Sequence, residues 1–314
     1  MEKPCVYLGD ELSEYHFGSK HPFGPHRYAA FYLEFKNRRL EQQVNIATPT
    51  QASIEQLTLF HSKEYIGQVA KQSATGIGFL DLGDTPARKG IYQAALTVVG
   101  TVLKAVDGIM SGSCSSAFVP IAGLHHARRD SAAGFCVFND CAIAIQALKK
   151  NYGLTRIAYV DIDAHHGDGV FYAYEEDETI CIVDLHEDGH FLYPGMGGKD
   201  ETGKAKAIGS KLNIPLPPGA DDRIALAMCE PAEKFIRLAE PEFIILQSGT
   251  DSLEGDPITD LKLSVSFHRY VAHRLTLLAV ELGHGRLLAL GGGGYELANI
   301  AGGWNAVVEG MLDR

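Results

Sequence analysis

The chain has 314 residues, of which 46% are hydrophobic and 21% charged, and its formal net charge is −11 at pH 7. These values are typical of a globular protein with a large core, and the negative charge argues against non-specific nucleic-acid binding, which needs a basic face. We find no run of about 18 apolar residues and no basic segment followed by an apolar one at the N-terminus. We therefore expect a cytoplasmic protein without a membrane-spanning helix or a secretory signal.

The six cysteines are scattered along the chain and form no CxxC pair. Several lie in apolar runs, such as VFNDCAIAI and TICIVDL, as buried residues do. We therefore expect reduced thiols packed in the core. They are Cys5, Cys114, Cys136, Cys141, Cys181 and Cys229.

Short apolar runs alternate with longer helical patterns along the whole chain, with no internal repeat or linker. We therefore predict one α/β domain over residues 1–314, with a mainly parallel sheet covered by helices on both faces. In chain order, the predicted elements are strand Cys5–Leu8, helices Pro25–Arg38, Ile54–Lys71 and Ala87–Ser111, strand Ala117–Ile121, helix Phe138–Tyr152, strands Arg156–Val160 and Thr179–Val183, helix Asp222–Ala239, strand Phe243–Gln247, helix Ser264–Leu282, strand Arg286–Leu290 and helix Glu296–Leu312.

Five of the predicted strands are followed directly by polar or glycine-rich segments. These segments are AGLHHARRD, DIDAHHGDG, DLHEDG, SGTDSLEGD and GGGGY, in chain order. In open α/β sheets, ligands bind beyond the carboxyl ends of the strands. We therefore expect a single site at that edge of the sheet to collect all five segments.

The segment DIDAHHGDG has the residue types of a metal site. Asp161, Asp163 and His165 have i, i+2, i+4 spacing, which places them on one face of an extended segment. Carboxylates this close repel each other unless a cation compensates them. Asp163 and His165 are suitable ligands for a borderline metal, and Asp251 could complete the set. Three protein ligands with an open position are typical of catalytic zinc, and no cysteine lies near them to suggest a structural site.

Two further segments offer catalytic groups. His125 and His126 are adjacent, and a histidine acts as a general base or acid when a partner orients it. Asp161 and Asp168 could supply two such partners, although a capped or core histidine is the simpler alternative for either ring. The GGGGY segment lacks the Lys-Ser/Thr of a phosphate-binding loop. It is better explained as a turn that passes close to the site and directs Tyr295 toward a developing oxyanion.

Taken together, these segments resemble the signature blocks of zinc-dependent histone deacetylases and their bacterial relatives, the acetoin-utilisation-type deacetylases and acetylpolyamine amidohydrolases. The matching blocks are HPFGPHR, AGLHHARRDSAAGFCVFND, YVDIDAHHGDGV, LYPGMGG, QSGTDSLEGDP and LGGGGYE, in family order. The resemblance implies the arginase/deacetylase fold, with its active site at the C-terminal ends of the strands. It also implies zinc bound by Asp163, His165 and Asp251, the tandem histidines His125 and His126 with partners Asp161 and Asp168, and Tyr295 as the carbonyl-polarising tyrosine.

The resemblance further implies how a substrate is held. Gly134 and Phe135 match a block that lines the acyl-lysine tunnel, and Tyr193 falls where the family often has the opposing aromatic residue. Asp84 resembles a rim aspartate that holds substrate backbone amides, and Arg27 matches an arginine deep in the internal cavity near the acetate exit.

Two positions depart from the family pattern. Asp184 stands where many relatives have a serine beside a structural potassium ion. The implied monovalent-cation site consists of Asp161, Asp163, His165, Asp184 and Leu185. Ile258 replaces a glutamate of polyamine-selective eukaryotic relatives, which removes a direct anchor for a distant ammonium group.

We therefore expect a zinc amidohydrolase, with Fe²⁺ as an alternative metal, that removes acetyl groups from N-acetylated amines. The simplest substrate is N6-acetyl-lysine in proteins or peptides, and small acetylated amines such as polyamines are the main alternative. A binuclear manganese ureohydrolase would need further ligands in a block such as GGDH, where this chain has GGGGY. A non-catalytic binding module would more often have lost a ligand or the tyrosine. We expect no nucleic-acid or membrane partner, and the oligomeric state stays open.

Overall fold

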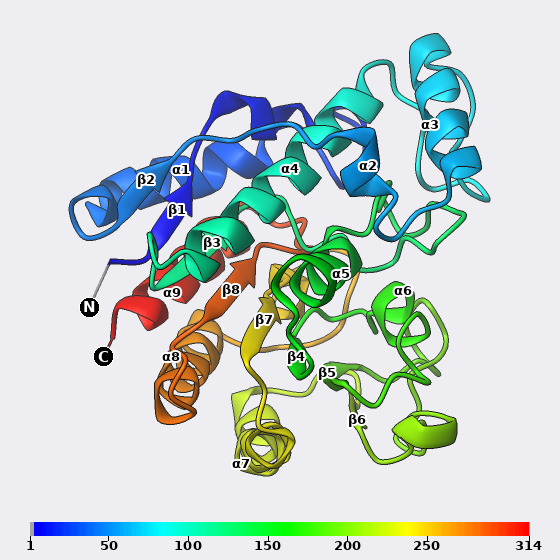
Figure 1. Ribbon diagram of the computed structural model, residues 1–314. Helices are drawn as coiled ribbons and strands as arrows, with labels where there is room; N and C mark the ends of the chain where they lie inside the picture. Colours follow the sequence, from blue (N-terminus) through cyan, green and yellow to red (C-terminus); the bar gives the residue numbers. More distant parts are fainter. Residues whose placement is uncertain (1–2, 314) are drawn as a thin grey trace.

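Eight parallel strands form one sheet at the centre of the computed structural model, which describes residues 3–313 (Figure 1). The strand order across the sheet is β2-β1-β3-β8-β7-β4-β5-β6. The strands are β1 (Cys5–Tyr7), β2 (Asn45–Ala47), β3 (Ser116–Val119), β4 (Ile157–Asp161), β5 (Ile180–Glu187), β6 (Lys211–Leu216), β7 (Phe243–Gln247) and β8 (Leu287–Leu290).

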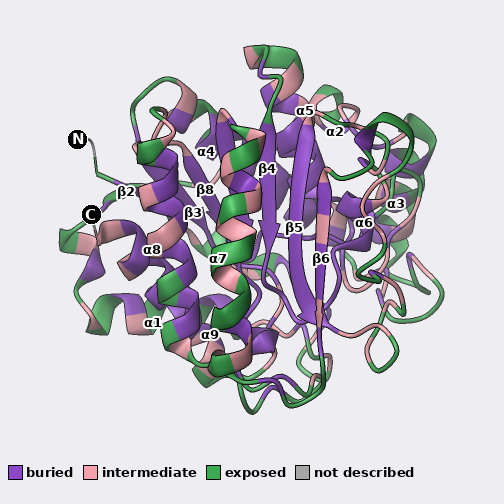
Figure 2. Cartoon of the chain, turned by 90° about the horizontal axis from the view of Figure 1, so that it is seen from below, coloured by how far each residue is buried: buried purple, intermediate pink, exposed green. Residues whose placement is uncertain are grey.

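Helices cover both faces of this sheet, so that its central strands are buried on both sides. Helices α7 and α8 lie on the face seen in Figure 2, whereas α4 and α5 lie on the opposite face. Every residue of β3, β4, β5, β7 and β8 is buried, which explains why apolar residues predominate in these strands. The helices are α1 (Arg27–Asn37), α2 (Ile54–Leu57), α3 (Lys63–Thr75), α4 (Ile91–Met110), α5 (Asp140–Tyr152), α6 (Asp168–Phe171), α7 (Asp222–Ala239), α8 (Val265–Glu281) and α9 (Leu297–Leu312), with short 3₁₀ turns η1 (Asp10–Glu14), η2 (Leu40–Gln42), η3 (Ala205–Ala207) and η4 (Thr250–Ser252).

The predicted α/β class and parallel sheet are confirmed, and so are the six predicted strands. The two edge strands were missed. The first, β2, has only three residues, and the second, β6, has Pro215, which an edge strand tolerates. The predicted helix Ile54–Lys71 is wrong as one element, because Ser62 caps a separate helix α3 with its side chain.

One helix meets the length and composition of a membrane span, contrary to our expectation that no stretch would. This helix is α4, which has 20 residues. Most of it is buried in the structure, where it packs against the sheet and against α5. A core helix passes the same test, so α4 is weak support for a membrane span.

The expectation of six reduced cysteines is wrong for one pair. Cys5 in β1 and Cys114, just before β3, form a disulfide. The two cysteines are 109 residues apart in sequence, but β1 and β3 are neighbours in the sheet. Among the described residues, Cys136, Cys141, Cys181 and Cys229 are free.

Candidate functional site

The candidate site lies at the carboxyl ends of four neighbouring strands, β3, β8, β7 and β4. The loop after β3 brings His125 and His126, and the segment after β4 brings Asp163 and His165. The turn η4 follows β7 and contains Asp251, and the glycine-rich turn follows β8. Parallel strands all end at the same edge, so segments far apart in sequence meet there.

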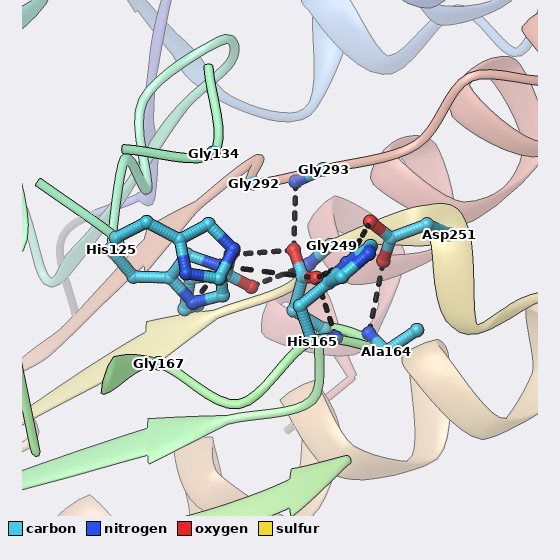
Figure 3. A network of polar contacts seen from close by, with 12 residues as sticks. His125, Gly134, Ala164, His165, Gly167, Gly249, Asp251, Gly292 and Gly293 are labelled. Carbon is cyan, nitrogen blue, oxygen red and sulfur yellow. Dashed lines mark hydrogen bonds and ion pairs between the residues drawn. The ribbon is translucent and has the colours of Figure 1, made fainter. Parts of the chain in front are cut away.

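Asp163, His165 and Asp251 form a buried cluster whose ligand-type atoms all lie within 4.8 Å of one another. His165 Nδ1 is 3.0 Å from Asp163 Oδ1 and 3.2 Å from Asp251 Oδ2. Figure 3 shows His165 and Asp251 turned toward each other, with the ring of His125 on the other side of the cluster. The expectation of a single extended face was wrong, because β4 ends at Asp161 and the next residues form a bend. The bend, rather than strand alternation, turns Asp163 and His165 toward Asp251.

The surroundings of this cluster fit a metal ion. Burial and the nearby Asp163 carboxylate raise the pKa of Asp251 to about 7, so a positive charge between the carboxylates would be stabilising. Backbone N–H groups of Ala164 and Gly293 donate to Asp251 Oδ1 and Asp163 Oδ2, at 3.0 Å and 2.9 Å, and orient both carboxylates. A Cβ atom on Gly293 would collide with the Asp251 carboxylate. Two carboxylates and one imidazole with room beside them are a donor set suited to zinc.

The tandem histidines are each paired with a buried aspartate. His125 Nδ1 is 2.8 Å from Asp161 Oδ2, and His126 Nδ1 is 2.7 Å from Asp168 Oδ1. The two Nε2 atoms are 3.1 Å apart, within hydrogen-bond distance, and both histidines line the same hollow. Tyr159 donates a second hydrogen bond to Asp161.

The two histidines have opposite charge preferences. Burial and the neighbouring His125 lower the pKa of His126 to about 4, despite its hydrogen bond with Asp168. Burial also disfavours a charge on His125, but Asp161 and Asp163 outweigh it and raise its pKa to about 10. His126 is therefore neutral at pH 7 and able to accept a proton.

A cavity of about 260 Å³ leads to the cluster and the tandem histidines. Phe135 and Tyr193 contribute aromatic rings to its walls, while Asp84 and Ile258 line it as exposed residues. Gly134 has a φ of 52°, and a side chain there would collide with the ring of His126. The partly aromatic lining of the cavity suits an aliphatic chain.

Tyr295 lines the same cavity, and a hydrogen bond of its backbone N–H fixes its position. Its N–H donates to Asp256 Oδ2 at 2.8 Å, and its ring packs against Phe135 and Phe23, with centroids 5.7 Å and 6.5 Å away. Burial and the nearby carboxylates of Asp251 and Asp163 raise the pKa of its phenol well above the usual value. The hydroxyl therefore keeps its proton and can act as a donor.

Comparison with known proteins agrees with this arrangement. A model of the histone deacetylase domain matches residues 21–311. The chain belongs to the histone deacetylase family. It is a deacetylase, and zinc dependence is the norm of that family.

Three relatives indicate the branch of the histone deacetylase family. The acetoin utilization protein AcuC of Bacillus subtilis is 36% identical over 306 residues, which cover 95% of this chain and 79% of that protein. AcuC of Staphylococcus aureus is 30% identical over 324 residues, covering 100% of this chain and 83% of that protein. Histone deacetylase clr6 of Schizosaccharomyces pombe is 31% identical over 312 residues, covering 96% of this chain and 75% of that protein. The acetoin-utilisation-type resemblance is thereby confirmed.

Arg27 of this histone deacetylase domain is buried beneath the glycine-rich turn. Its Nε and Nη2 donate to the carbonyl oxygens of Gly294 and Gly292, at 2.8 Å and 2.6 Å. The guanidinium also lies 3.8 Å above the ring of Phe23. Arg27 therefore shapes the turn that precedes Tyr295, and its role in acetate release stays a prediction.

Asp184 lies in β5, directly beside Asp161 of β4 in the sheet register. Both of its carboxylate oxygens have partners. Oδ1 is 2.8 Å from His186 Nδ1, and Oδ2 accepts from the N–H of Gly167 at 2.8 Å. Leu185, the next residue, is buried in the same strand.

Three residues that our sequence reasoning did not single out support the site. Gln247 donates to Asp163 Oδ2 at 2.8 Å, Arg128 Nη2 donates to Asp168 Oδ2 at 3.0 Å, and Asp256 anchors Tyr295. All three lie within or beside the quoted motifs. Their position in the sequence, close to proposed functional residues, is the one signal that could have identified them.

Proposed function

We propose that this deacetylase hydrolyses the acetyl amide of N6-acetyl-lysine in proteins or peptides, by attack of a metal-activated water. The observation that carries the proposal is the buried cluster of Asp163, His165 and Asp251 next to the neutral ring of His126, in a cavity with a partly aromatic lining. A ligand set, a base and an access route for an aliphatic chain thus occur together.

Zn²⁺ is the metal we propose, with Fe²⁺ as an alternative that the same ligands accept. Asp163, His165 and Asp251 would hold it. When bound, such an ion supplies a Lewis acid for the acetyl carbonyl and acidifies a water molecule. A binuclear manganese centre is disfavoured, because the described residues contain one three-ligand group.

The chain's own residues account for the proton transfers. His126, oriented by the hydrogen bond between its Nδ1 and Asp168, accepts the water proton at Nε2 and can pass it to the leaving amine. His125, paired with Asp161, is favoured in its charged form and acts mainly as an electrostatic partner. The Tyr295 hydroxyl donates to the oxyanion that develops on the acetyl carbonyl.

The residues at the mouth favour acetyl-lysine over acetylated polyamines. Asp84 is exposed there and can accept hydrogen bonds from the backbone amides of a peptide. Ile258 offers a distant ammonium group no ion pair.

We also propose a structural potassium ion close to the metal centre. Asp161, Asp163, His165, Asp184 and Leu185 are the residues that would contribute. The Asp184 carboxylate would contribute its charge there, and each of its oxygens keeps a lone pair beside the hydrogen bond that it already accepts. Potassium added over the millimolar range should raise the melting temperature and the turnover of the wild type. If neither responds, the potassium site is abandoned.

The test of the main proposal is a direct comparison of substrates on the metal-loaded protein. We expect one divalent metal per chain, and faster turnover of acetyl-lysine peptides than of acetylated spermidine or putrescine. Faster turnover of the polyamines would replace the proposed substrate class, and no hydrolysis of any acetylated amine by the fully metallated protein would refute the activity.

A further inference from the structure

A second hollow of about 630 Å³ lies beside the cavity that leads to the metal cluster. We call it the side groove. Asp84 and Tyr193 line both spaces, so the two are neighbours at these residues. Residues 131–133 of the side groove are small, and within residues 3–313 Arg128 contributes the one cationic side chain that lines it. A chain that enters the cavity with one side chain can therefore continue along the groove with its next residues.

Arg128 is an exposed residue that is hydrogen-bonded to a buried carboxylate. Its Nη2 donates to Asp168 Oδ2 at 3.0 Å; the Arg128 side chain is 56% exposed, whereas that of Asp168 is fully buried. The backbone N–H of Arg128 donates to the carbonyl of Ser131, which ties the residue into a short hairpin. The guanidinium is therefore held in place before any ligand arrives, and less side-chain entropy is lost on binding.

Two aspartates, Asp81 and Asp84, also line the side groove, and their surroundings differ. Asp81 Oδ1 accepts from the backbone N–H groups of Gly83, Asp84 and Thr85, at 2.9–3.1 Å, so this carboxylate stabilises its own turn. Asp84 is exposed at the shared mouth. A bound peptide would thus meet an acceptor for its backbone at the mouth and a cation farther along.

We propose that the side groove binds the residues next to the acetyl-lysine, and that Arg128 selects substrates with an acidic side chain there. This inference rests on the proposed acetyl-lysine activity. A carboxylate complements the exposed part of the guanidinium, whereas a second ammonium group, as in an acetylpolyamine or a lysine-rich segment, is repelled by it.

The experiment uses acetyl-lysine peptides that differ at one flanking position, with Glu, Gln or Lys placed in turn on each side of the acetyl-lysine. Both kcat/KM and the Kd of fluorescently labelled peptides are measured on the metal-loaded protein. At the flanking position that reaches the side groove, we expect the Glu peptide to exceed the Gln peptide by about two- to fivefold in kcat/KM and in affinity, as is typical of an exposed ion pair. Lys should be the poorest, and the preference should weaken at high salt.

The variant Arg128→Gln should abolish the difference between Glu and Gln peptides. It should also lower turnover on every peptide, because Asp168 loses a partner, so the ratio between peptides is the decisive quantity. Arg129→Gln is the matched control, since Arg129 is the exposed neighbour and does not line the groove. This control should keep the wild-type ratio.

The outcomes separate this inference from the proposed activity. Equal Kd and kcat/KM for the Glu and Gln peptides, or a Glu preference that survives in Arg128→Gln, would overturn the role of Arg128 while the deacetylase activity stands. A charge preference in Kd that depends on Arg128, without hydrolysis of any peptide, would support the groove and refute the proposed activity.

Discussion

The replacement of Tyr295 by phenylalanine isolates a single hydroxyl group in the proposed mechanism. No hydrogen bond of this hydroxyl is found within residues 3–313, so its removal leaves no buried partner unsatisfied. The ring contacts with Phe23 and Phe135 and the backbone bond to Asp256 are retained. Tyr295→Phe should therefore keep the melting temperature of the wild type within about 1 °C.

The effect on catalysis should be large by comparison. The pKa of Tyr295 is well above its usual value, so the wild-type hydroxyl carries its proton throughout the working pH range. Loss of one donor to an oxyanion typically lowers kcat by about 10²–10³, or about 2.7–4 kcal/mol. Because the hydroxyl acts mainly on the transition state, KM should change much less than kcat.

The assay compares steady-state kcat and KM on one acetyl-lysine peptide, with the zinc content of both proteins matched by elemental analysis. Tyr270→Phe is the control, since this half-exposed tyrosine lies on α8, away from the cavity. Its kcat should equal that of the wild type. If Tyr295→Phe turns over within about threefold of the wild type, the hydroxyl does not stabilise the oxyanion and the proposed mechanism is wrong.

Three further predictions concern the metal, the pH dependence of stability and the disulfide. Asp251→Asn should lower metal affinity by more than about 100-fold and abolish activity, because the loss of a ligand costs more than the loss of a supporting residue; an active variant with one zinc per chain would remove Asp251 from the ligand set. Burial lowers the pKa of His61 from 6.5 to about 4, so the unfolded chain binds a proton that the folded chain does not between these values. The contribution of His61 to the free energy of unfolding should fall by on the order of 3 kcal/mol as pH drops from 6.5 to 4, so urea titrations should show a smaller fall for His61→Gln than for the wild type; equal slopes would contradict this. Reduction of the disulfide between Cys5 and Cys114 should lower the free energy of unfolding by about 2–4 kcal/mol. A thiol titration of the unfolded, non-reduced protein should find four free thiols, and six would show that the disulfide does not form.

The sequence by itself determined the α/β class and the edge of the sheet at which the site lies. Buried parallel strands such as β4 and β7 have continuous apolar patterns, and polar residues begin where each strand ends. These signals are local, because each depends on residues close together in the chain. The side-chain types in each motif are also local information, and the carboxylates and imidazoles among them indicated a metal site.

The tertiary structure decided which of these groups meet. The pairing of His125 with Asp161 and of His126 with Asp168 depends on how the loop after β3 crosses the end of β4. The disulfide depends in the same way on β1 lying beside β3. Such contacts join residues that are tens of positions apart, and spacing in the sequence does not encode them.

The sequence also did not reveal the residues that support the site through hydrogen bonds. Gln247, Asp256 and Arg128 act through hydrogen bonds to residues on other strands or loops, and each residue type is common on protein surfaces. Only their burial or their position beside the cavity distinguishes them. The side groove likewise exists because small residues from one loop face a turn from another, so packing rather than any motif creates it.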